Sequence, residues 1–164
     1  MNIRLYFLIG VMAILTPVDL YGQDKQSVGW IEKAIIVPSN TVLDAKLDTG
    51  AETSSINAVD INKFDRDGET WVRFTVEDKT GQKVTLERKL LGVAEIKRHQ
   101  GPPQKRLVVS LGICVGRHYA ETNVNLVDRS RFKYPLLIGR SFMAGRLLPD
   151  PSVEYTVEPS CKEQ

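Results

Sequence analysis

Alternation of apolar and polar side chains is the main signal along this chain. In the clearest case, Leu43, Ala45 and Leu47 alternate with Asp44 and Lys46, which is the period of a strand with one buried face. Similar segments predict strands over residues 30–37, 41–47, 53–58, 71–76, 83–88, 93–96, 106–109, 111–115, 119–127 and 136–138, with a further alternating stretch at 155–157. About eight to ten strands with almost no helix predict an all-β barrel or sandwich.

Turn residues between these segments predict hairpins. Residues 78–81 join two alternating runs and form the clearest hairpin turn of the chain. A second hairpin spans 94–108, and its tip over 100–103 is polar and contains Gly101. A long polar tip of this kind is expected to project from the body of the protein and to move.

Two shorter motifs have simpler interpretations. Residues 65–68 resemble the start of a calcium-binding loop, but the remaining ligands and the distal glutamate are missing, so a hairpin turn is favoured. After the apolar run 136–138, Ser141 is expected to cap a single helical turn that ends at Gly145.

The start of the chain has the pattern of a secretory signal peptide. Arg4 gives a positive start, residues 5–15 are almost wholly apolar, and small residues follow near Gly22. We therefore divide the chain into a signal peptide over 1–22, a folded domain over 28–157 and a C-terminal tail over 158–164. An uncleaved anchor is the alternative for the first segment. Cleavage would leave a periplasmic or secreted domain without a stable membrane span.

Composition excludes few functions, but it bears on a nucleic-acid partner and on the state of the two cysteines. The formal net charge of +2 and the mixing of acids with bases give no indication of a nucleic-acid partner. Only Cys114 and Cys161 are present, and export would place both in an oxidising compartment. They could pair and tie the tail to the body, or Cys114 could be a buried thiol in an apolar strand.

The candidate chemistry lies where the strand 41–47 ends. Asp48 is followed by Thr49 and Gly50, and glycine with neighbouring hydroxyl residues can hold a carboxylate rigidly on a tight turn. A strand-terminating turn without chemistry is the alternative. Zinc catalysis has no support, because His99 and His118 are the only histidines and both fall in predicted turns. No phosphate-binding glycine loop is present either.

A single carboxylate is a weak base for activating water. Two facing carboxylates share one proton across a bound water, so that one can accept the proton of the water while the other protonates the peptide carbonyl. This chain offers one Asp-Thr-Gly, at Asp48. A second copy of the chain could supply the other acid if Asp48 lies on a two-fold axis, which predicts a homodimer.

Two motifs carry a resemblance to a known family. The run Leu47-Asp48-Thr49-Gly50-Ala51 and the segment from Pro135 to Met143 resemble the paired signatures of retropepsin-like aspartic proteases. Within that superfamily, the chain is similar over residues 28–157 to the bacterial family labelled putative ATP-dependent zinc protease. The resemblance implies a closed single-lobe β-barrel and an aspartic endopeptidase without cofactor or metal. It also implies a mobile flap in the hairpin 94–108.

The resemblance also assigns roles to individual residues. Asp48 matches the catalytic acid, Thr49 the residue whose hydroxyl joins the two active-site loops across the dimer, and Gly50 the residue that lets backbone approach substrate. Substrate contact is implied for Ala51, Glu52 and the flap residue Gly101. Leu137, Ile138 and Gly139 match the structural support beneath the loop, together with Arg140, which is expected either to pair with Glu52 or to leave two solvated charges.

Two departures leave other functions open. The hairpin over 71–91 is additional to a minimal retroviral protease, and the flap tip carries Pro102-Pro103 where retroviral tips are rich in glycine. The alternatives to an exported aspartic endopeptidase are a non-catalytic β-barrel that binds envelope peptides and a zinc peptidase with unrecognised ligands.

Overall fold

The computed structural model describes residues 25–97 and 101–161, so the expected signal peptide lies outside the described residues. Within them, ten strands and one helical turn are formed, and no helix has the length and apolarity needed to cross a membrane. The elements are β1 (Gln26–Val37), β2 (Thr41–Leu47), β3 (Ser54–Asn57), β4 (Val59–Arg66), β5 (Glu69–Glu77), β6 (Lys83–Ile96), β7 (Gln104–Val115), β8 (His118–Val127), β9 (Leu136–Ile138), α1 (Arg140–Met143) and β10 (Leu147–Glu154).

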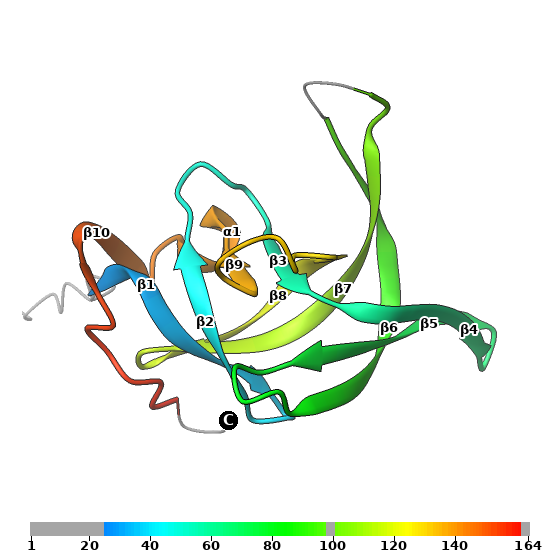
Figure 1. Ribbon diagram of the computed structural model, residues 1–164, viewed down its shortest axis with the longest axis horizontal. Helices are drawn as coiled ribbons and strands as arrows, with labels where there is room; N and C mark the ends of the chain where they lie inside the picture. The colour runs from blue at the N-terminus through cyan, green and yellow to red at the C-terminus, as the bar shows by residue number, and fades with distance from the viewer. Residues whose placement is uncertain (1–24, 98–100, 162–164) are drawn as a thin grey trace, which may run out of the picture.

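Six strands close into a barrel in the order β1-β2-β9-β3-β8-β7, and β7 returns to β1. The closure depends on how β7 uses one of its edges. Residues 104–109 of β7 pair with β6, whereas residues 112–115 pair with β1. The expected all-β barrel is therefore confirmed, with β10 on one side and β6, β5 and β4 extending from the other (Figure 1).

The alternating pattern places one face of each barrel strand in the core. On β2, Leu43, Ala45 and Leu47 are buried, while Lys46 points to the other face. The helical turn α1 adds its two apolar side chains to the same core. The largest fully buried apolar side chains are Phe74, Phe142, Ile31, Ile36, Leu43, Ile56, Leu111, Ile113, Leu136 and Ile138.

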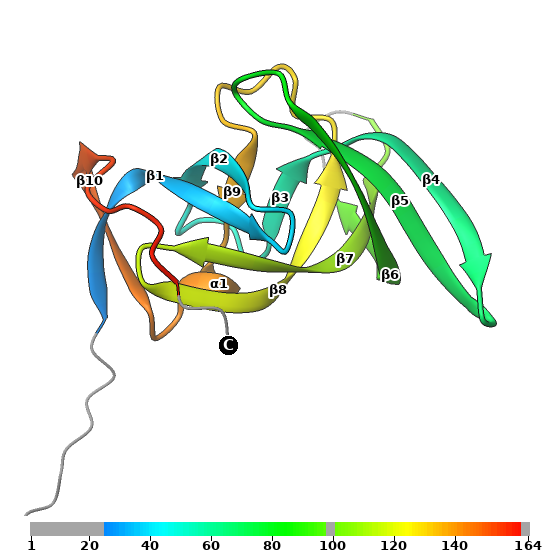
Figure 2. The same cartoon turned by 90° about the horizontal axis from the view of Figure 1, so that it is seen from below.

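A three-stranded wing, formed by β4, β5 and the first half of β6, projects from one end of the barrel (Figures 1 and 2). The sequence predicts separate strands over 83–88 and 93–96, but β6 runs unbroken from 83 to 96. A register shift between Leu90 and Gly92 absorbs the break in the alternating pattern. The segments 106–109 and 111–115 likewise merge into β7.

The expected cap at Ser141 is wrong. Gly139 is the N-cap of α1 and makes no side-chain cap bond, because glycine has no side chain. Ser141 lies inside the turn and its hydroxyl donates to the carbonyl oxygen of Glu52 at 2.9 Å. The serine therefore binds the loop that follows Asp48.

The C-terminal segment folds back over β1. The alternating stretch at 155–157 does not form a strand, because β10 ends at Glu154 and pairs in parallel with β1. Residues 156 and 157 instead donate to the fully buried carboxylate of Glu32, from Thr156 N (2.9 Å), Thr156 Oγ1 (2.6 Å) and Val157 N (3.3 Å). Gly29 N adds a 2.6 Å bond to Glu32, and a Cβ on Gly29 would lie 2.6 Å from Val153 O, so only glycine fits this crossing.

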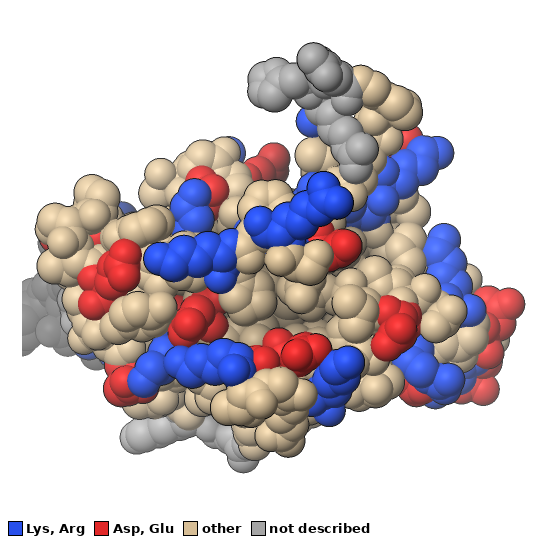
Figure 3. All heavy atoms as spheres, viewed as in Figure 1, with Lys and Arg blue, Asp and Glu red and all other residues tan. Residues whose placement is uncertain are grey.

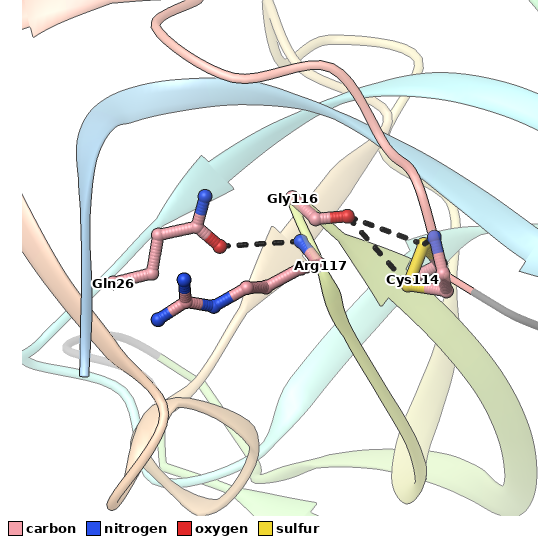
Figure 4. Close-up of a disulfide and its surroundings, with 5 residues drawn as sticks. Gln26, Cys114, Gly116 and Arg117 are labelled. Carbon is pink, nitrogen blue, oxygen red and sulfur yellow. Dashed lines mark hydrogen bonds between the residues drawn. A yellow bond between two sulfur atoms is a disulfide. The ribbon is translucent and has the colours of Figure 1, made fainter. Parts of the chain in front are cut away.

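A disulfide between Cys114 and Cys161 fastens the end of this segment, which resolves the two alternatives for these cysteines (Figure 4). It joins β7 to the tail over a sequence separation of 47. Ser160 N also donates to Gly116 O at 2.7 Å, and Lys33 Nζ pairs with Glu158 at 2.7 Å. The part of the tail up to Cys161 is thus bound to the barrel.

Candidate active site

Asp48 lies directly after β2, on a tight turn that fixes its carboxylate. Asp48 N donates to Ile138 O of β9 at 2.9 Å, and Ala51 N donates to Asp48 O at 3.2 Å. Gly50 N donates to Asp48 Oδ1 at 2.9 Å. A Cβ at Gly50 would lie 3.1 Å from that same oxygen, so any larger residue would press on the carboxylate. One carboxylate oxygen is therefore held by backbone.

The loop after Asp48 is held from below by β9 and α1. Arg140 N donates to Ala51 O at 2.9 Å, and Ser141 N donates to Glu52 O at 3.0 Å. Gly139 N donates to Ser54 Oγ at 3.1 Å. A Cβ at Gly139 would lie 2.6 Å from the carbonyl carbon of Thr53, so the loop approaches β9 only because this residue is glycine. The structural support implied for this segment is thus visible in its contacts.

The expected pairing of Arg140 with Glu52 is not formed. Arg140 Nη1 donates to Thr49 O at 2.9 Å instead, and both Arg140 and Glu52 are exposed. The guanidinium binds a backbone carbonyl of the same loop and so still joins α1 to the Asp48 turn. Thr49 is exposed as well, and no described hydrogen bond within the chain uses its hydroxyl.

The side chains of Lys46 and Asp48 lie on the outer face of the barrel sheet. Residues in register on neighbouring strands share a face, and the register of Lys46 continues through β9, β3, β8 and β7. Leu137 is half-buried on this face, while Ile138 is fully buried in the core beneath it. The residues in this row are Lys46, Leu137, Ser55, Asn125 and Val108.

Two cations accompany Asp48 that the sequence did not single out. Lys46 Nζ lies 3.5 Å from Asp48 Oδ2. Arg129, in the connection after β8, is 7% exposed and donates to Ser55 Oγ at 3.0 Å and to Tyr134 O at 3.2 Å. Burial lowers the pKa of the Arg129 guanidinium, the neighbouring Arg106 lowers it further, and the Asp48 carboxylate opposes both.

The sequence indicates one of these two cations but not the other. The spacing of two residues on a strand places Lys46 on the face of Asp48, so the sequence could have indicated it. Nothing in the sequence marks Arg129, because its side-chain bond to Ser55 joins residues 74 positions apart, although Phe132 and Tyr134 lie in the same connection. Acidic and basic side chains are interspersed over the face in Figure 3, and no single basic tract dominates it.

The hairpin of β6 and β7 rises on the same side of the barrel as the loop 48–53 (Figure 1). Gly101 precedes β7, is exposed and has a positive φ of 86°. No described hydrogen bond or ion pair joins Gly101 to the Asp48 loop, and its expected contact with substrate stays a prediction. Ala51 is half-buried in the loop itself. Across the described residues, no group of three or more metal-binding side chains gathers.

Comparison with known proteins gives the family. The model of the RimB-like family, described as the retropepsin-like aspartic endopeptidase RimB, matches residues 27–160. The chain belongs to this family. The match covers both the Asp48 turn and the Gly139 support, and it confirms the retropepsin-like fold that the two motifs implied.

The chain also resembles part of larger proteins. A probable alpha-L-glutamate ligase of Shewanella halifaxensis is 37% identical over 116 residues, which is 69% of this chain and 25% of that protein. A protein of the same name from Desulfotalea psychrophila is 32% identical over 124 residues, 74% of this chain and 27% of that protein. The chain thus matches about a quarter of the length of these curated relatives.

A solved structure matches the fold over most of its own length. The crystal structure of a Legionella pneumophila protein of unknown function is 38% identical, with a TM-score of 0.71. The likeness covers 80% of this chain and 98% of the Legionella protein. A fold like that of this chain therefore makes up nearly all of that crystallised chain.

Proposed function

We propose that this chain is an aspartic endopeptidase that works as a homodimer. The observation that carries the proposal is the Asp48 carboxylate, which is 27% exposed, with Oδ1 held by Gly50 N and Oδ2 on the outer side of the sheet. A carboxylate fixed in this way can hold a water molecule against a peptide carbonyl. The family match supports the same chemistry.

The proposed reaction uses one Asp48 from each of two chains. The two carboxylates share one proton across a bound water. One carboxylate accepts a proton from the water as its oxygen attacks the peptide carbon, and the other protonates the carbonyl oxygen. Collapse of the tetrahedral intermediate then breaks the C–N bond, and the amine leaves with a proton. In a single chain Thr49 is exposed and Asp48 is half-buried, which leaves both side chains accessible to a second loop.

Peptides with acidic side chains near the scissile bond are the proposed substrate class. Lys46, whose side chain is 40% exposed, provides positive charge beside Asp48. The curated relatives carry the name alpha-L-glutamate ligase, and a ligase of that kind is expected to produce glutamate-containing peptides. A peptidase domain within such a protein would meet acidic peptides, which supports the same preference here.

Export to the periplasm or beyond is part of the proposal. The disulfide between Cys114 and Cys161 supports an oxidising compartment. The apolar run at residues 5–15 supports a signal peptide. Detection of the processed chain in the periplasmic or extracellular fraction, with its disulfide formed, would be the expected result.

The test combines sedimentation with peptide cleavage by the purified chain. Wild-type protein is expected to form dimers and to cleave acidic peptides, whereas Asp48→Asn should abolish cleavage and leave the thermal unfolding midpoint unchanged. Asp67→Asn, at an exposed aspartate in the β4–β5 turn, serves as the matched control and should remain active. Cleavage that survives Asp48→Asn, or that disappears with a chelator, would contradict the proposal. A strict monomer that binds peptides without cleaving them would indicate the non-catalytic barrel instead.

A further inference from the structure

We infer that Lys46 is a positioning residue of the proposed Asp48 pair, whose ammonium offsets the negative charge that two carboxylates bring together. This inference rests on the proposed homodimer and concerns how the two halves of the site can meet. It assigns Lys46 an effect through Asp48 and not a contact with the reacting peptide bond.

The geometry begins with the spacing of the two residues. Lys46 is the penultimate residue of β2 and Asp48 is the first residue after it, so both side chains leave the same face of the strand. The ammonium lies 3.5 Å from Oδ2, while Oδ1 accepts the bond from Gly50 N. Oδ1 is therefore bound by a backbone N–H group, and Oδ2 faces the Lys46 ammonium.

The other charged groups around Asp48 are engaged elsewhere. Arg129 is bound to Ser55 Oγ and Tyr134 O, and the guanidinium of Arg140 is bound to Thr49 O. Glu52 adds a further exposed acid to the loop. Over residues 25–97 and 101–161, Lys46 is the one cation within ion-pair distance of Asp48. It is therefore the group best placed to neutralise this carboxylate.

Charge compensation has a clear consequence for assembly. Two carboxylates at the separation of a shared water repel each other strongly, and like charges placed face to face oppose association. With one Lys46 beside each Asp48, the ammoniums offset the two carboxylate charges that approach each other before the pair takes up its shared proton. Without the ammoniums these two negative charges are uncompensated, and the dimer should dissociate more readily. The lysine is 40% exposed, so salt should weaken its effect.

The experiment is a double-mutant cycle on the full chain. Lys46→Met and Lys46→Arg are made in the wild type and in Asp48→Asn, and dimer dissociation constants are measured by sedimentation at low and high salt. Lys63→Met is the matched control, because Lys63 is exposed on β4 and has no ion pair among the described residues. Thermal unfolding of every variant reports any general loss of structure.

Lys46→Met is expected to raise the dissociation constant roughly tenfold at low salt, and Lys46→Arg should restore it. In the Asp48→Asn background the same Lys46→Met change should have no effect, because the carboxylate charge is absent. For an uncharged peptide substrate, Lys46→Met should lower kcat with little change in KM, which separates an effect on Asp48 from binding of acidic side chains.

Equal effects of Lys46→Met in both backgrounds would show a merely structural lysine and overturn the inference. An unchanged dissociation constant, with unchanged kcat, would overturn it as well. In both cases the proposed function would stand if Asp48-dependent cleavage by a dimer is observed. A wild-type chain that stays monomeric at every concentration would instead overturn the proposed dimer together with this inference.

Discussion

Arg140 of α1 donates from Nη1 to the carbonyl oxygen of Thr49 at 2.9 Å and so joins the helical turn to the loop that carries Asp48. Replacing Arg140 by Met should lower the free energy of unfolding by only about 1 kcal/mol, since the residue is exposed. The loss of kcat should be larger, about tenfold to a hundredfold, because small displacements of a reacting group are costly. Peptide cleavage and urea unfolding measure the two effects.

A matched control for this prediction is Arg88→Met. Arg88 Nη1 also donates to a backbone carbonyl, that of Glu87 at 2.8 Å, but it lies in the wing. This variant should retain wild-type kcat. Equal losses of activity in both variants would show that Arg140 has no special role at the loop.

Gly139→Ala should be among the most damaging single-methyl additions to this protein. The new Cβ would lie 2.6 Å from the carbonyl carbon of Thr53 and 2.7 Å from Glu52 O, so the backbone of the Asp48 loop would have to move. We expect a loss of about 2–4 kcal/mol in the free energy of unfolding. Gly92→Ala on β6 is the control, because nothing lies within 4 Å of a Cβ there. Similar stability of the two variants would contradict the close approach.

Glu32→Gln should destabilise the C-terminal segment. The amide oxygen can still accept the bonds from Thr156, but the N–H₂ group then faces the N–H of Val157, so a buried hydrogen bond is lost at a cost of about 1–3 kcal/mol. Amide hydrogen exchange at these two residues should increase. Glu158→Gln removes only the exposed pair with Lys33 and should cost less than about 0.5 kcal/mol. Unchanged amide hydrogen exchange at Thr156 and Val157 in Glu32→Gln would contradict this prediction.

Reduction of the disulfide between Cys114 and Cys161 should lower stability by about 2–4 kcal/mol, because closing a loop of this size restricts the unfolded chain. A Cys114→Ser, Cys161→Ser double variant should behave like the reduced wild type in chemical unfolding and should not respond to a thiol reductant. A reductant-insensitive wild type would indicate that the cysteines are unpaired in solution.

Local pattern predicted most of the fold and the position of the turn that carries Asp48. The alternation in β2 and the Asp-Thr-Gly after it placed Asp48 correctly at a strand end, and the glycine of the second motif matched its supporting role. The full length of β6 was harder to predict, because the register shift between Leu90 and Gly92 interrupts the alternating pattern and makes one strand look like two.

Partners that are distant in the sequence were not predictable in the same way. The choice of Arg140 between Glu52 and Thr49 O depends on the reach of a side chain across 91 positions. Glu32 could have been flagged as an acid inside an apolar strand, but its donors come from residues 124 and 125 positions away. The domain boundaries and the export of the chain stay predictions.

Because β7 changes its pairing partner along its length, the molecule has a closed barrel and, beside it, a two-stranded ribbon of β6 and β7. Where β7 pairs with β1 and β8, every strand of the barrel has neighbours on both edges. From residue 104 to 107, β7 has only β6 beside it, and a two-stranded ribbon twists and bends more freely than a wider sheet. The ribbon can therefore bend while the hydrogen-bond ladder of the barrel stays intact, so the shape of this hairpin and the stability of the barrel depend on separate sets of hydrogen bonds.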